Sequence, residues 1–364
     1  MAKLPPVYEY TESTALLQSL HPFLPYSLPL YRRLQFGRRS SHAHILSTLP
    51  PEEPRPAAAA TENAEALCLG VAFVDRSCRP ETEAWFFLSH DAPGHISQRP
   101  ADCTCTTHLF ALLGHIGGLA FPALSAEAEA DALAAVNAAV PDKAAAHHVH
   151  TSAPAAAYLT YMNEQAFLKA GTLHSRNVSE LRARDCLRTD MPGVDFPYVK
   201  YIFSRDCSTV TDVSGTANVG SLPDSLRWGA LREEDFALVR SRTAIPRTNR
   251  TLRSLPSAAI FPVEPATAPI AWAFLGVDGS LVSLHVEPGY RGCGLAKTVA
   301  RKLLRQGNMA FGDAPVVDFH ADVALENKES HSVCRSLGGK QHWEVYWVRI
   351  DLTRIREKTE KGEY

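Results

Sequence analysis

One short segment, from Val286 to Ala296, constrains the fold of this chain more than any other. It reads Val286-Glu287-Pro288-Gly289-Tyr290-Arg291-Gly292-Cys293-Gly294-Leu295-Ala296. Its glycines permit positive φ angles and let a ligand approach the backbone closely. The first N–H groups of a following helix lack internal partners and lie at the positive end of its dipole. The segment therefore predicts a strand, a loop that holds a phosphate or pyrophosphate, and a helix start.

Two common nucleotide motifs are missing around this loop. Its spacing is not the GxxxxGK[ST] pattern of P-loop proteins, and the chain has no GxGxxG fingerprint. Nucleotide hydrolysis and nicotinamide redox chemistry are therefore disfavoured. Arg291 and Lys297 add positive charge near the glycines, which supports an anionic ligand of another class.

Size and charge set broad limits. The chain has 364 residues, with 45% hydrophobic and 21% charged residues and a net charge of -2. This composition predicts a globular protein of two domains and gives no reason to bind nucleic acid or an anionic membrane. We see neither a secretory signal nor an apolar run of the ~20 residues that a membrane span needs. The cytoplasm is the expected location, with the mitochondrion as the alternative.

The eight cysteines do not resemble a disulfide framework. Cys103, Cys105 and His108 could form half of a zinc site, but no CxxC or HxxxH pair completes a set of four ligands. We therefore favour free thiols before a helix and expect no metal.

Hydrophobic patterning predicts alternating strands and helices. In the first half we expect two paired strands, Leu67–Val74 and Glu83–Leu88, and the following further elements: helices 12–23, 109–119, 126–139 and 155–168, and strands 147–151 and 198–203. In the second half, Asp278-Gly279 predicts a hairpin turn. Around it we expect strands 226–231, 258–261, 270–275, 280–287, 316–323 and 343–350, and helices 232–242, 248–255, 295–305 and 327–337.

The glycine loop gains meaning from two later segments. The run from Leu284 to Ala296 resembles the central motif of the GNAT N-acetyltransferase superfamily. Asn327-x-x-Ser330-x-x-Val333-Cys334-x-x-Leu337-Gly338 resembles that family's asparagine helix, and Trp343–Val348 its closing strand. The whole layout is most similar to the glycine N-acyltransferase-like branch, which joins two halves and has an FR-type C-terminal acyl-CoA domain. Leu16–Tyr31 and Ile270–Leu275 carry that likeness.

The resemblance implies an α/β (α+β) fold with two GNAT-like mixed central sheets, flanked by helices and arranged in tandem. We expect a degenerate GNAT-like domain at 1–205, a linker at 206–225, the acyl-CoA-binding catalytic domain at 226–353 and a tail at 354–364. Acetyl-CoA or another acyl-CoA is the implied co-substrate. The implied coenzyme-binding residues are Leu284, Val286, Arg291, Gly292, Cys293, Gly294, Leu295, Ala296, Lys297, Asn327 and Ser330.

The implied reaction moves an acyl group directly, in a ternary complex, to a primary amine of a small molecule or amino acid. On strand 280–287, simple alternation would place Val282, Leu284 and Val286 on one face and Ser283, His285 and Glu287 on the other. His285 is the first candidate for general base because its ordinary pKa suits neutral pH, and the alternative is a structural histidine. Glu287 and Asp278 are the second candidates, although Asp278 also suits a turn.

The chain departs from the family pattern at four positions, one of which is Gly339 in place of the usual phenylalanine. Ser280 stands where the glycine acyltransferases are expected to carry a glutamate base. Cys334 replaces the usual tyrosine acid, and Gly289 replaces the usual Gln or Arg. The changes at Ser280 and Cys334 keep open a catalytically impaired CoA-binding sensor. A protein lysine or N-terminal acetyltransferase is the other alternative. The expected partners are the amine and acyl-CoA, in a monomer or homodimer.

Overall fold

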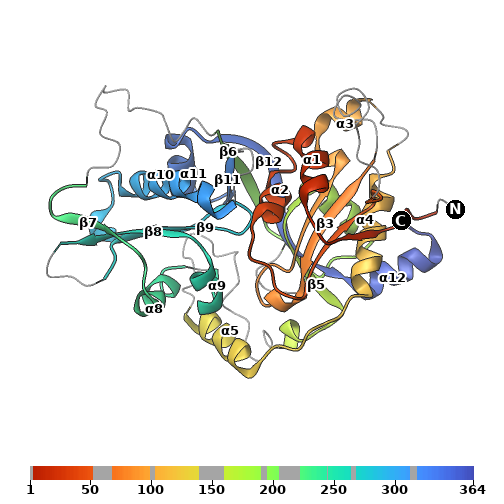
Figure 1. Cartoon of the computed structure of the whole chain (residues 1–364), viewed down its shortest axis with the longest axis horizontal. Coiled ribbons are helices and arrows are strands. Elements are labelled where there is room, and N and C mark those ends of the chain that lie inside the picture. The colour runs from red at the N-terminus through yellow and green to blue at the C-terminus, as the bar shows by residue number, and fades with distance from the viewer. Residues whose placement is uncertain are drawn as a thin grey trace. The chain divides into compact units, whose positions relative to one another are not determined.

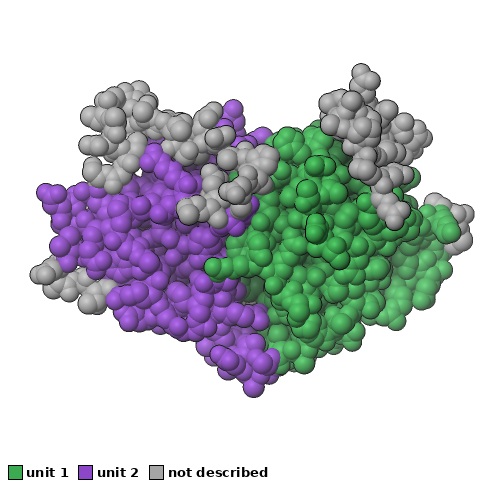
Figure 2. All heavy atoms as spheres, in the orientation of Figure 1, with its two compact units in different colours: residues 1–124, 159–197, 343–364 green, residues 125–158, 198–342 purple. Residues whose placement is uncertain are grey.

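The computed structural model describes residues 3–51, 68–98, 103–138, 160–189, 195–204, 222–243, 245–263, 268–311 and 318–364. The chain divides into two compact units, coloured separately in Figure 2. Unit 1 contains residues 1–124, 159–197 and 343–364, and unit 2 contains residues 125–158 and 198–342. Among the described residues, no helix is long and apolar enough to cross a membrane.

Unit 1 is built on a mixed sheet whose strands run in the order β1-β2-β3-β4-β5-β12. All neighbours are antiparallel except β4 and β5, which are parallel. The last strand comes from the C-terminal end of the described chain and pairs with β5 from Val345 to Asp351. The strands are β1 (Tyr8–Tyr10), β2 (Ala43–Ser47), β3 (Gly70–Asp75), β4 (Ala84–Leu88), β5 (Phe167–His174) and β12 (Lys340–Asp351).

Helices cover both faces of this sheet, so β3 and β4 are buried along their whole length. Ala72 and Phe86 face a core that includes side chains of α4, α7 and α12. On the opposite face, the Phe23 ring lies 5.2 Å from that of Phe87, and the Arg33 guanidinium of α2 lies 3.6 Å from the centre of the Phe73 ring. The helices are α1 (Thr14–Leu20), α2 (Leu28–Gln35), α3 (Pro93–Gln98), α4 (Cys105–Gly117), α7 (Ser175–Ala183) and α12 (Leu352–Lys361).

Unit 2 contains an antiparallel sheet of order β10-β9-β8-β7 and a second antiparallel pair, β6 with β11. Trp272 and Phe274 of β9 pack against Phe236 and Leu252 of α8 and α9, while Figure 1 shows α10 on the other side of the sheet. The strands are β6 (Pro197–Phe203), β7 (Leu226–Gly229), β8 (Ser257–Pro262), β9 (Ala271–Leu275), β10 (Leu281–Val286) and β11 (Phe319–Ala324). The helices are α5 (Ala126–Ala138), α8 (Phe236–Arg240), α9 (Asn249–Ser254), α10 (Leu295–Gly307) and α11 (Lys328–Ser336).

The expected mixed α/β fold with two sheets flanked by helices is confirmed. The expected strand 147–151 and most of helix 155–168 lie outside the described residues. Within the described part, the end of that helix is wrong, because Phe167 and Leu168 begin β5 and pair with Asp351 and Ile350. The expected helix 232–242 is divided into a 3-10 turn, Glu233–Asp235, and the short α8. The domain boundaries at 205 and 226 stay a prediction.

Candidate functional site

The glycine loop lies between β10 and α10, as the sequence predicts. A 3-10 turn, Pro288–Tyr290, follows the strand, and α10 begins at Leu295. Gly292 and Gly294 have positive φ angles of 81° and 77°. A Cβ atom added at either residue would meet nothing within 4 Å. Glycine is therefore required here by the left-handed backbone and not by a lack of space.

The start of α10 presents backbone donors to solvent at this loop. Its first helical hydrogen bond runs from the Thr298 N–H to the Gly294 carbonyl, at 3.1 Å. The N–H groups of Leu295 and Ala296 precede that bond, at the positive end of the helix dipole. Residues 288–294 are exposed, including the Cys293 thiol, which lies 3.7 Å from the Arg291 carbonyl. The loop can therefore receive an anion from solvent.

Arg291 links the loop to the end of β10. Its Nε atom donates a hydrogen bond to the Val286 carbonyl at 3.0 Å. The Glu287 N–H donates to the Ile270 carbonyl at 2.8 Å, which attaches the same strand end to the residue before β9. Lys297 lies in the first turn of α10. Two cations and the helix start thus share one end of the sheet.

A β-bulge in β10 corrects the simple alternation expected for this strand. Val282 pairs with Phe274 and His285 with Trp272, so two residues of β10 oppose one residue of β9. Ser283, in the bulge, has a φ angle of 51°. Partners two residues apart on β9 share a face, so Val282 lies on the face of His285 and not on that of Val286. The expected apolar face of Val282, Leu284 and Val286 is wrong at Val282.

His285 lies near the end of the bulged strand, beside Trp272 of β9. Its ring stacks on Trp272 with centroids 4.7 Å apart. Among the described residues, buried Nε2 has no hydrogen-bond partner, and Glu287 Oε1 lies 3.7 Å from it. Burial lowers the pKa of His285 below the ordinary 6.5, and the Glu287 charge opposes this shift. The ring is therefore neutral at pH 7 and can accept a proton.

Glu287 connects His285 to a cation. Its Oε1 atom accepts a hydrogen bond from Arg242 Nε at 2.9 Å. The Glu287 side chain is 20% exposed and that of His285 is 16% exposed. A carboxylate in this position can stabilise an imidazolium that forms when His285 takes a proton.

Asp278, the other candidate carboxylate, is engaged in the turn before β10. One of its oxygens accepts from the Ser280 N–H at 3.1 Å and from the Ser280 hydroxyl at 2.5 Å. Its main-chain carbonyl lies 2.8 Å from Nε2 of buried His320. These contacts are those of a turn-forming aspartate.

The asparagine helix places its predicted residues in capping and core positions. Asn327 caps α11 by accepting from the Ser330 N–H at 2.9 Å. Cys334 is buried, and burial raises the pKa of its thiol to about 12. His331 Nδ1 lies 2.8 Å from the Tyr201 hydroxyl, and its Nε2 lies 3.1 Å from the Ala324 carbonyl. The thiol is therefore protonated at neutral pH but is a weaker acid than a free cysteine, and His331 has other partners.

One buried charged cluster in unit 2 was missed by sequence reasoning. Lys200 Nζ lies 2.6 Å from Asp322 Oδ1 and 3.1 Å from His320 Nδ1, and all three side chains are buried. His320 and Asp322 stand two residues apart on β11, opposite β6. That spacing was the available signal, but nothing in the sequence pairs it with Lys200. Through Asp278, the cluster supports the turn from which β10 begins.

Two family models match the chain. The model for the acyl-CoA N-acyltransferase verG N-terminal domain matches residues 4–201, and the model for FR47-like protein matches residues 264–348. The second match includes the glycine loop and α11. No curated protein matches the chain.

Solved structures also resemble the chain. A Drosophila protein is 14% identical, with a TM-score of 0.52 over 94% of this chain and 98% of its own. A tandem GNAT protein from the clavulanic acid biosynthesis pathway is 10% identical, with a TM-score of 0.45 over 95% and 98% of the two chains. The Drosophila likeness supports the fold alone, whereas the verG model covers more than half of the chain. The resemblance predicted from the sequence is thus confirmed, and the chain belongs to the acyl-CoA N-acyltransferase family represented by the verG N-terminal domain.

Proposed function

We propose that this protein transfers an acyl group from acyl-CoA, with acetyl-CoA as the first candidate, to the primary amine of a small molecule or amino acid. One observation carries the proposal. The left-handed glycines and helix start that suit a pyrophosphate lie on the same strand–loop–helix segment as His285, whose Nε2 has no hydrogen-bond partner among the described residues.

In this proposal the loop binds the coenzyme. The N–H groups from Gly292 to Ala296 and the side chains of Arg291 and Lys297 hold the pyrophosphate, and the β10 backbone at Leu284 and Val286 contacts pantetheine. Asn327, which caps α11 by accepting from the Ser330 N–H, and Ser330 itself are assigned a supporting role at the coenzyme. The coenzyme supplies the thioester and leaves as a thiol.

His285 removes a proton from the acceptor ammonium, and Glu287 stabilises the imidazolium that results. The free amine attacks the thioester carbonyl, and the C–S bond breaks as the nitrogen gives up its second proton and the amide forms. That proton balances the one that the departing thiolate takes up. The buried Cys334 thiol, whose pKa is about 12, is the candidate donor to the departing thiolate. Asp278 is the weaker candidate for the base because its carboxylate oxygen already accepts from Ser280.

The two alternatives predict different products. A protein acetyltransferase would modify lysines or N-termini of peptides, whereas a CoA-binding sensor would bind the coenzyme without releasing thiol. We favour the small-amine enzyme over the sensor because a buried imidazole nitrogen with no hydrogen-bond partner in the described part of the chain is costly to keep without a role.

The test measures free thiol release from acetyl-CoA and longer acyl-CoAs mixed with pools of amines, amino acids and peptides. We expect release that depends on a small amine, with the acylated amine identified by mass spectrometry. Release only with peptides would favour the protein-modifying alternative. Coenzyme binding by thermal shift without release in any pool would contradict the enzyme and favour the sensor.

A further inference from the structure

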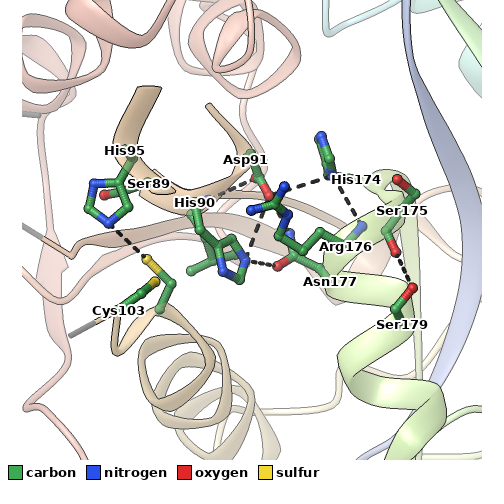
Figure 3. Close-up of polar contacts among 12 residues, drawn as sticks. Ser89, His90, Asp91, His95, Cys103, His174, Ser175, Arg176, Asn177 and Ser179 are labelled. Atoms are coloured by element: carbon green, nitrogen blue, oxygen red, sulfur yellow. Dashed lines mark hydrogen bonds and ion pairs between the residues drawn. The ribbon is translucent and has the colours of Figure 1, made fainter. Parts of the chain in front are cut away.

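Three cysteines and one histidine of unit 1 converge although they are far apart in sequence. Cys68 precedes β3, His95 lies in α3, and Cys103 and Cys105 lie at the start of α4. Their ligand atoms all lie within 4.8 Å of one another. Figure 3 shows the His95 ring directed toward the sulfur atoms beside Cys103. The four side chains therefore meet at one point.

The separations are those of ligands around one small metal ion. Cys68 Sγ lies 3.9 Å from Cys103 Sγ and 3.4 Å from His95 Nε2, and Cys105 Sγ lies 3.7 Å from the same nitrogen. Tetrahedral zinc, with bonds of about 2.3 Å to sulfur and about 2.0 Å to nitrogen, requires about 3.8 Å between sulfurs and about 3.5 Å between sulfur and nitrogen. These three distances agree with that geometry, and the other pairs of ligand atoms lie within 4.8 Å. A disulfide would need sulfurs about 2.0 Å apart.

Backbone groups beside two of the sulfurs also favour thiolates. The Thr104 N–H donates to Cys68 Sγ at 3.2 Å, which is the kind of backbone contact that orients a metal ligand. Cys105 is the first residue of α4, where the helix dipole favours negative charge. His95 and Cys105 are buried, and Cys68 and Cys103 are half-buried.

We propose that Cys68, His95, Cys103 and Cys105 bind one zinc ion in a closed structural site. Four protein ligands leave no open position for water or substrate, so the ion has no part in acyl transfer. Binding releases the thiol protons to solvent and leaves the imidazole neutral. The ion would join the start of β3 to α3 and to the start of α4.

His108, which the sequence suggested as a ligand beside Cys103 and Cys105, is not one of the four. Its Nδ1 lies 2.7 Å from the Thr48 hydroxyl, which also accepts from the Gly70 N–H at 2.9 Å. The proposed set of four ligands could not be predicted from the sequence, because Cys68 and His95 form no recognisable motif with the later cysteines. Only the fold brings them together.

The experiment measures zinc in the full chain, purified under reducing conditions without added metal, by elemental mass spectrometry. We expect about one zinc per chain. Cys68→Ser and Cys103→Ser should reduce the zinc content at least about tenfold, a loss typical when a ligand is removed. Cys78→Ser is the matched control, since Cys78 is also half-buried in unit 1 but lies outside the cluster. It should keep its zinc.

A second measurement uses the wild-type chain alone, in case a serine variant does not fold. Cobalt(II) replaces the removed zinc, and the visible absorption of tetrahedral, thiolate-bound cobalt is expected. Three results would overturn the proposal: a zinc-free chain that gives no such spectrum, equal zinc in Cys68→Ser and Cys78→Ser, or a metal-free Cys68–Cys103 disulfide in the intact protein.

Discussion

Each of the two units contains a histidine close to a carboxyl group. The two pairs have similar separations but different hydrogen-bond partners. His90 Nε2 lies 3.8 Å from Asp91 Oδ1 in unit 1, and His285 Nε2 lies 3.7 Å from Glu287 Oε1 in unit 2. In unit 1 the atoms are satisfied by neighbours: Asn177 Oδ1 lies 2.5 Å from His90 Nε2, and Asn177 Nδ2 donates to Asp91 at 2.9 Å (Figure 3).

Burial lowers the pKa of both histidines, but the unit 1 pair also contains a buried acid whose pKa is raised. Burial lowers the pKa of His90 to about 4 and raises that of Asp91 to about 7. Both groups are therefore neutral between these values, so the separation of 3.8 Å describes a polar contact and not an ion pair. His285 has the Glu287 carboxylate 3.7 Å from a ring nitrogen that has no hydrogen-bond partner among the described residues. What distinguishes a candidate base from a structural histidine is thus the set of partners and not the distance to an acid.

The largest expected effect is the loss of His285. His285→Ala should slow amine-dependent thiol release at least about a hundredfold, because general base catalysis contributes at least that much. Coenzyme binding by thermal shift should be unchanged. His342→Ala, which replaces another histidine of unit 2, is the control. A loss below about tenfold in His285→Ala would transfer the base assignment to Glu287 or to solvent.

Prediction from the sequence succeeded for features that depend on residues adjacent in the chain. The strand–loop–helix at Gly292 and the Asp278-Gly279 turn could be predicted because adjacent residues determine them. The bulge at Ser283 could not, since no glycine or proline marks it, and it reverses the face of Val282. The partners of His90 come from residue 177, far along the chain, and therefore have no signature near residue 90.

The buried His90–Asp91 pair should affect the pH dependence of the free energy of unfolding. Between about pH 4 and pH 6.5, folded His90 is neutral while the unfolded residue is protonated, so this residue makes the free energy of unfolding rise with pH. Folded Asp91 stays protonated up to about pH 7 although the unfolded residue has already ionised, so this residue makes the free energy of unfolding fall with pH. In wild type the two effects oppose each other.

In each single variant, only the remaining group of the pair should affect the pH dependence of stability. Relative to wild type, His90→Gln should lose stability as pH rises through this window, and Asp91→Asn should gain it, each by up to about 1.4 kcal/mol per pH unit. Chemical denaturation at several pH values measures both slopes. Parallel slopes in the two variants would show that the pair titrates as one ion pair.

A smaller effect is expected in the loop. Gly292→Ala should weaken coenzyme binding about tenfold, because a left-handed alanine costs about 1–2 kcal/mol. Gly289→Ala is the matched control: an added Cβ is equally unobstructed there, and Gly289 has no positive φ. Calorimetric titration with coenzyme A compares the two. Equal losses would mean that the ligand needs space at both positions and not the backbone conformation.

The smallest expected change concerns the acid limb of the pH profile of thiol release. Its midpoint should lie below 6.5, because burial lowers the pKa of His285 and the base form persists to lower pH. Glu287→Gln should move it lower still, since Glu287 raises this pKa, and Arg242→Gln should move it upward. Shifts within about one unit are expected for such partly exposed charges. Movement in the same direction for both variants would contradict the proposed arrangement.

The return of the chain to the first sheet has a consequence for biosynthesis. β12 pairs with β5 only after unit 2 has been translated, since residues 343–364 follow the last residue of that unit. All segments of unit 2 are therefore synthesised before the last segment of unit 1. Until then β5 lacks its β12 neighbour, and a chain stalled before Trp343 would expose a strand edge that invites pairing with other polypeptides.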